Sequence, residues 1–161
     1  MLSRRHPPPA DVPPGAEVGF DHAYGWLRDQ LDTLDEYDRK LGVALTVQFA
    51  ITAALLTIDT ALVRREALRV AVLGLLALAQ VSSAAALLVR PNRKAPEPAQ
   101  FVTYAGLPVA EMKWRAVPAL LEAIRINTLA ITWKRRLFAF DVVALALIGA
   151  GVLLGRVFNL T

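Results

Sequence analysis

Three long stretches of the sequence are almost free of charged residues. Residues 41–63, 67–89 and 137–158 consist mainly of Leu, Val and Ala. An α-helix needs about 20 such residues to cross the roughly 30 Å hydrocarbon core of a bilayer. A buried helix of a soluble protein is usually shorter and keeps a polar stripe along one side. The sequence therefore predicts an all-α membrane protein with three transmembrane helices.

Basic residues flank these stretches unequally. The chain has 18 Lys and Arg residues and a formal net charge of +4. With a cytoplasmic N-terminus, 14 of the 18 fall on the cytoplasmic side, which is the distribution that the positive-inside bias favours. The bias accounts for the basic charge, so we expect the lipid bilayer as a partner and no nucleic acid. The expected topology is multi-pass, with the N-terminus in the cytoplasm.

The sequence before the first span divides into two segments. Residues 1–18 are rich in proline and are expected to form a disordered tail. In residues 19–40 the apolar side chains recur at steps of three or four positions, which predicts one face of a helix. These positions are Phe20, Tyr24, Leu27, Leu31 and Leu34, continuing to Leu41. No proline separates them from the first span, so we expect a cytoplasmic stalk helix that continues into the membrane.

Residues 90–136 are expected to form a cytoplasmic loop followed by a second stalk helix. Helical character is expected to resume after Pro108, and the last proline, Pro118, suits the first turn of a new helix or a kink. Because no proline follows it, this helix is expected to run without a break into the third span. Trp26, on the first stalk, is expected to pack between the two stalks.

The chain lacks the residues that most enzymes use for catalysis. It has no cysteine, and its two histidines, His6 and His22, have no partner at a metal-ligand spacing. A glycine-rich phosphate loop is also absent, and none of the three serines has a base beside it. We therefore expect no enzymatic activity, no metal and no cofactor.

Two charged clusters lie where the stalks meet the spans. Residues 38–40 read Asp-Arg-Lys, and residues 134–136 read Lys-Arg-Arg. Both clusters are expected near the cytoplasmic headgroups, where they can bind a phosphate or anchor the helices to anionic lipid. The sequence leaves both interpretations open. The candidate ligand-binding residues are Asp38, Lys40, Asn127 and Lys134.

Several polar or small residues lie inside the expected spans. Polar side chains within a bilayer usually face other helices, where they line a path or hold the helices together, and Gln48, Gln80 and Asp141 are such residues. Asp141 either pairs with an arginine at the cytoplasmic end or lines a pore. Gly151 and Gly155 form a small-xxx-small pattern that allows close helix approach within the bundle or between protomers.

Three sequence elements together resemble a known family. Asp38 and Lys40 lead into the first span, Arg90-Pro91 ends the second, and a helix with Asn127 and Lys134 leads into the third. This combination is similar to the transmembrane effector of the Pycsar bacterial antiphage system. The resemblance covers roughly residues 26–155 and leaves out the proline-rich tail.

The resemblance implies a function in the bacterial inner membrane. In that family a companion cyclase makes a cyclic pyrimidine mononucleotide, cCMP or cUMP, on phage infection. The effector then impairs the inner membrane, and the infected cell stops growing or dies. Here Lys40 and Lys134 are implied to meet the phosphate, while Asp38 or Asn127 reads the base edge. Because three spans cannot enclose a wide pore, we expect a homo-oligomer.

The same residues are also compatible with a second function. The chain can be a constitutive membrane scaffold, or an accessory subunit of a transport or conjugation apparatus. Such a protein needs no ligand. The basic clusters at the ends of the spans then act only as anchors.

Overall fold

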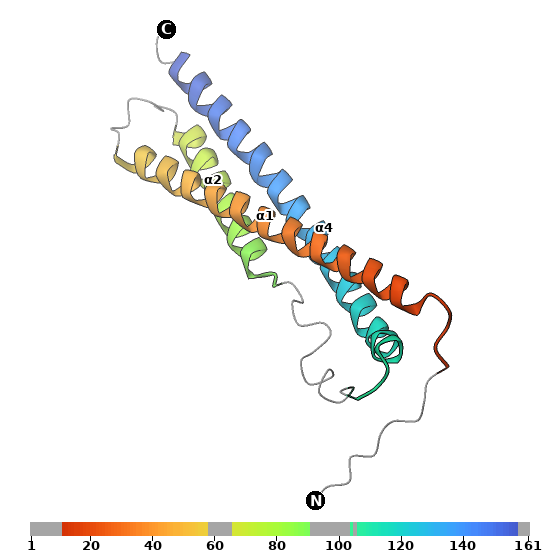
Figure 1. The fold of residues 1–161 in the computed structure, drawn as a ribbon. Helices are drawn as coiled ribbons and strands as arrows, with labels where there is room; N and C mark the ends of the chain where they lie inside the picture. Colours follow the sequence, from red (N-terminus) through yellow and green to blue (C-terminus); the bar gives the residue numbers. More distant parts are fainter. Residues whose placement is uncertain (1–10, 58–65, 91–103, 105, 158–161) are drawn as a thin grey trace, which may run out of the picture. The chain divides into compact units, whose positions relative to one another are not determined.

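The computed structural model describes residues 11–57, 66–90, 104 and 106–157. These residues form three α-helices, α1 (Ala16–Thr57), α2 (Glu66–Leu88) and α4 (Val109–Val157), and contain no strand (Figure 1). Each of these helices is long enough and apolar enough to cross a membrane. The predicted all-α membrane protein with three transmembrane helices is therefore confirmed.

Helix α1 begins at Ala16, earlier than the predicted stalk, and continues without a break to Thr57. It starts after a turn in which the amide of Ala16 donates to the carbonyl of Pro13 at 3.2 Å. Gly15, within that turn, has a φ of 86°, a conformation that residues with a Cβ rarely adopt. The first stalk and the first span thus belong to one helix. The predicted tail lies outside the described residues up to position 10.

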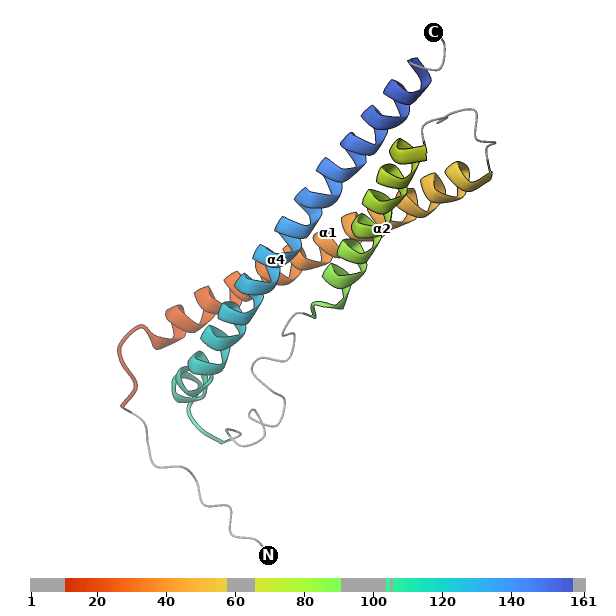
Figure 2. The same ribbon diagram turned by 180° about the vertical axis from the view of Figure 1, so that it is seen from behind.

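Helix α4 begins at Val109, directly after Pro108, where the sequence predicted that helical character resumes. Pro118 lies inside the helix. In Figures 1 and 2 the first turns of α4 are seen end-on, whereas the turns that follow run across the view. Proline bends a helix because it lacks an N–H and its ring clashes with the carbonyl four residues earlier. Most of the predicted loop, residues 91–103 and 105, lies outside the described residues.

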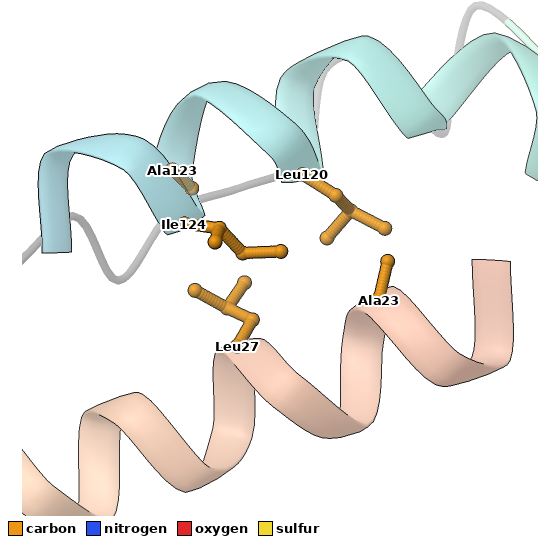
Figure 3. Packing of buried hydrophobic residues seen from close by; sticks show 5 residues of the cluster. All are labelled: Ala23, Leu27, Leu120, Ala123 and Ile124. Atoms are coloured by element: carbon orange, nitrogen blue, oxygen red, sulfur yellow. The ribbon is translucent and has the colours of Figure 1, made fainter. Parts of the chain in front are cut away.

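Helices α1 and α4 each contribute to two compact units, and the boundary falls after Asp32 in α1 and after Thr128 in α4. The first unit contains the beginnings of both helices. They pack through a small apolar cluster, shown in Figure 3, of Ala23, Leu27, Leu120, Ala123 and Ile124. Trp26 is not part of this contact. Its side chain is 56% exposed, so the prediction that it packs between the stalks is wrong.

The second unit contains α2 and the remaining parts of α1 and α4. Its apolar core is formed by Val72 and Leu76 of α2 with Ile148 of α4. Many other large apolar side chains of this unit are exposed, including Phe49 and Leu147. This distribution suits a membrane, because lipid tails solvate a leucine or a phenylalanine as well as another helix does.

Most buried residues of α4 follow a seven-residue repeat. They are Ala116, Leu120, Ala123, Asn127, Ala130, Lys134, Asp141, Ala144, Ile148 and Gly155. Helix α1 has the same spacing in Leu27, Gln30, Leu34, Leu41, Ala44 and Gln48. This repeat is typical of helices that pack as in a coiled coil. We call these buried positions along a helix its buried line. Polar residues occur on the buried line of each helix alongside apolar ones, and they define the candidate site.

Candidate functional site

A buried ion pair joins α1 to α4 in the second unit. The ammonium group of Lys134 contacts the carboxylate of Asp38. The Lys134 side chain is fully buried, whereas that of Asp38 is 32% exposed. An ammonium group is costly to remove from water unless a carboxylate compensates its charge. Asp38 therefore explains how a lysine can occupy the buried line of α4.

The three consecutive basic residues of α4 have different environments. Lys134 is buried, whereas Arg135 and Arg136 are exposed. Successive residues of a helix point about 100° apart, since one turn takes about 3.6 residues. Only one residue of the three can therefore lie on the buried line.

Lys40 does not take part in the buried pair. Its ammonium group lies 2.6 Å from Oε1 of Glu36 on the same helix, and both side chains are about half exposed. The hydrogen bond from Lys40 holds the pKa of the Glu36 carboxyl below its usual value. An exposed pair of this kind is weak, because water screens both charges. The Lys40 ammonium thus stays available to another anion.

Asn127 belongs to the first unit, whereas Asp38, Lys40 and Lys134 belong to the second. The Asn127 side chain is fully buried. On the neighbouring residue, Thr128, the hydroxyl accepts a 2.9 Å hydrogen bond from the amide of Gln30 on α1. The first unit therefore has polar residues of its own on the line where its helices meet.

A second polar group lies deeper in the second unit and takes one residue from each helix. Ser83 of α2 donates a 2.6 Å hydrogen bond to Oδ2 of Asp141 on α4. The same hydroxyl lies 3.4 Å from Oε1 of Gln48 on α1. All three side chains are fully buried. We call Gln48, Ser83 and Asp141 the polar layer. Of the two roles considered for Asp141, pairing with an arginine is not seen among the described residues.

The polar layer has unused hydrogen-bonding capacity. A serine hydroxyl has one proton, so Ser83 cannot donate to Asp141 and to Gln48 together. Nε2 of Gln48 and Oδ1 of Asp141 are buried without a partner in the described residues. Turning the Gln48 amide over would let Nε2 donate to Ser83, which donates to Asp141. Oε1 of Gln48 would still be free for a water molecule or a cation, and the hydroxyl of Ser82 is a second neighbour of the Asp141 carboxylate.

Gln80 lies beside the polar layer and links α2 to α1. Its amide nitrogen donates a 2.8 Å hydrogen bond to the hydroxyl of Thr52. That hydroxyl donates in turn to the backbone carbonyl of Gln48 at 2.8 Å. In this arrangement Gln80 holds two helices together.

Gly151 marks a close approach between α4 and α2. A Cβ at this position would lie 3.3 Å from a methyl group of Val72, closer than ordinary van der Waals contact. Gly155 is buried on the same line of α4. The small-xxx-small pattern thus includes at least one position where the missing side chain lets two helices of the same chain meet.

The variant Gly151→Ala is expected to be less stable than Gly149→Ala. Nothing lies within 4 Å of a Cβ at Gly149, so alanine there brings only its better helix propensity, about 1 kcal/mol. At Gly151 the same gain is offset because Val72 must move. We expect the two unfolding free energies, measured by denaturant titration in detergent micelles, to differ by about 0.5–1 kcal/mol. Equal stability of the two variants would contradict the close approach.

A comparison with protein-family models found no match for this chain. Curated proteins and solved structures likewise gave no match. The functional conclusion therefore depends on the geometry of the ion pair and the polar layer, and on the sequence elements described above.

Proposed function

We propose that this chain is a membrane effector of a bacterial antiphage defence system. It senses a cyclic pyrimidine mononucleotide, cCMP or cUMP, and impairs the inner membrane as a homo-oligomer, which arrests growth or kills the cell. The observation that carries the proposal is the buried ion pair between Asp38 and Lys134. Each of these residues lies on a helix that also contains a candidate membrane span. The N-terminus is cytoplasmic in this proposal, so the ion pair faces the compartment where the nucleotide is made.

The ion pair offers the nucleotide a target. The phosphate of a cyclic mononucleotide carries one negative charge and accepts charge-assisted hydrogen bonds. It competes with Asp38 for Lys134, while the exposed ammonium of Lys40 supplies a second contact. Asp38, once released, accepts a hydrogen bond from the base edge.

The continuity of α1 and α4 supports coupling between the nucleotide and the membrane. Lys134 and Asp141 are seven residues apart on α4, which corresponds to about 10 Å along a helix. A shift of α4 at Lys134 moves Asp141 because no break separates them. The ligand can shift the equilibrium only by its different affinities for the two states. In the oligomer, the free acceptor atoms of the polar layer then line the path through which solutes leak.

Release of a dye from lipid vesicles tests the proposal. The purified chain is inserted into dye-loaded vesicles, and cCMP, cUMP or cAMP is added. We expect release with at least one pyrimidine nucleotide, little release with cAMP, and a weaker response from Lys40→Ala. The Arg135→Ala variant is the matched control, because Arg135 is exposed and lies outside the ion pair. Intact vesicles after addition of both pyrimidine nucleotides, with insertion verified, would refute the proposal.

A constitutive membrane scaffold is the second candidate, and the polar layer favours it. Gln48, Ser83 and Asp141 join all three helices without any ligand. Buried polar groups of this kind can fix the register of packed helices. The scaffold has no use for a nucleotide, so it predicts intact vesicles in the same assay and an unchanged complex with its partner.

A further inference from the structure

The second unit contains an apolar groove between α1 and α4. Its volume is about 440 Å³, within the roughly 300–1,000 Å³ range of small-molecule sites. Arg39 and Lys40 lie at one end of it, and no residue of α2 is among its lining residues. The apolar walls are formed by Val43, Ala44, Val47, Phe138, Val142 and Leu145.

The walls of the groove suit a hydrocarbon chain. Val43 and Val142 are 61% and 50% exposed, and both lie in helices that contain candidate membrane spans. Lipid can therefore contact both side chains. The wall from Arg39 to Val47 spans about 12 Å at the helical rise of 1.5 Å per residue. With Arg39 at the headgroup level that the sequence predicts, a groove of this length reaches into the hydrocarbon, so an acyl chain can lie along it.

The polar end of the groove is positively charged. Arg39 and Lys40 directly precede the apolar residues of the first span, at the depth where phosphates of lipid headgroups lie. Lys40 pairs with Glu36 in an exposed ion pair that a phosphate can displace, and its ammonium group also lies over the ring of Tyr37. Basic residues beside a membrane-facing groove favour anionic over zwitterionic lipids.

We propose that this groove binds an anionic phospholipid, with an acyl chain between Val43 and Val142 and the headgroup phosphate at Arg39 and Lys40. A second copy of the chain fits less well. In a symmetric dimer the same patch faces itself, so the Arg39 and Lys40 pairs of the two copies would approach each other. A lipid phosphate neutralises the same charges. The proposal goes beyond the effector function and needs no nucleotide; a lipid phosphate and a nucleotide phosphate would compete for Lys40, whereas Arg39 belongs to the lipid site alone.

Native mass spectrometry of the purified full chain tests this site. Phosphatidylglycerol and phosphatidylcholine with identical acyl chains are added separately, without nucleotide. We expect preferential binding of phosphatidylglycerol. The Arg39→Gln variant should lower that affinity about fivefold, the effect expected for one basic residue near an anionic headgroup. It should leave phosphatidylcholine binding unchanged. The Val43→Trp variant, which fills the groove from an exposed position, should weaken the binding of both lipids.

Arg135→Gln is the matched control, since Arg135 is an exposed basic residue of α4 that does not line the groove. Equal binding of the two lipids, or equal losses in Arg39→Gln and Arg135→Gln, would overturn the proposal. A second copy in the groove is tested separately. The chain has no cysteine, so a Val43→Cys variant that forms a disulfide between copies in phosphatidylglycerol vesicles would also overturn it. No such disulfide is expected while lipid fills the groove.

Discussion

Replacing Asp38 with asparagine is expected to lower the free energy of unfolding by about 3–5 kcal/mol. The substitution keeps the size of the side chain but leaves the fully buried Lys134 ammonium without a counter-charge. Lys134→Met should cost less, because the Asp38 carboxylate is 32% exposed and water can hydrate it. Unfolding in detergent micelles, followed by circular dichroism, measures both effects.

The double variant Asp38→Asn/Lys134→Met separates the energy of the pair from the cost of an unpaired charge. With both charges removed, we expect stability to return to within about 2 kcal/mol of the parent chain, because a well-packed uncharged replacement of a buried ion pair is often neutral. Lys40→Met is the surface control and should change stability little, since Lys40 is exposed. Additive losses in the double variant would show that the pair is not coupled.

The charge swap Asp38→Lys/Lys134→Asp distinguishes the two candidate functions. It keeps an ion pair between α1 and α4 but moves the cation to the other helix. An effector that binds a phosphate at Lys134 should lose its response to cCMP and cUMP while its stability is largely retained. A scaffold that needs the pair only to hold its helices together should keep its function. The stability measurement shows that any lost response is not caused by unfolding.

The number of candidate spans was predictable from composition, because a helix surrounded by lipid needs an unbroken run of apolar residues. The continuity of α1 from stalk to span was predictable too, because no proline separates the two. The start of α4 was predictable as well, because helical character was expected to resume after Pro108 and the helix begins at Val109. The sequence left open whether Pro118 begins a new helix or bends a continuing one, and Pro118 lies inside α4.

The buried side of the stalks was only partly predictable. The apolar spacing placed Tyr24 on the buried face of the first stalk, but its side chain is 52% exposed. The same spacing left out Ala23 and Gln30, which are buried. Small and polar residues fill the line where two helices approach closely, so the apolar residues alone do not identify which side of the helix is buried. The spacing itself held the missing signal. The residues at intervals of seven along α4 are all buried: Leu120, Asn127, Lys134, Asp141, Ile148 and Gly155.

Burial of Lys134 could have been inferred from that spacing, but its partner could not. Any of three consecutive basic residues can be an anchor or a ligand as long as the buried side of the helix is unknown. Lys134 is seven residues from both Asn127 and Asp141, so it lies on the same side of the helix as they do and is buried with them. Which carboxylate meets it depends on the axial offset between α1 and α4, and no local pattern in the sequence encodes that offset.

Replacing Asp141 with leucine is expected to abolish nucleotide-triggered dye release while the three-helix fold is retained. Leucine fills the buried space and removes the cost of keeping a carboxylate away from water. Ser83 and Gln48 can still bond each other, because the Ser83 hydroxyl loses its other acceptor. A path through an oligomer would lose its charged lining group, so polar solutes would no longer pass.

Ser83→Ala is the matched variant, because it removes the hydroxyl that donates to Oδ2 of Asp141 but keeps the carboxylate. It leaves a buried acceptor unsatisfied and should destabilise the chain by about 1–3 kcal/mol, while dye release persists. The two variants thus have opposite expected effects: Asp141→Leu keeps stability and loses release, and Ser83→Ala loses stability and keeps release. If Asp141→Leu still releases dye at the parental rate, the polar layer serves helix packing, and the leak must follow another surface of the bundle.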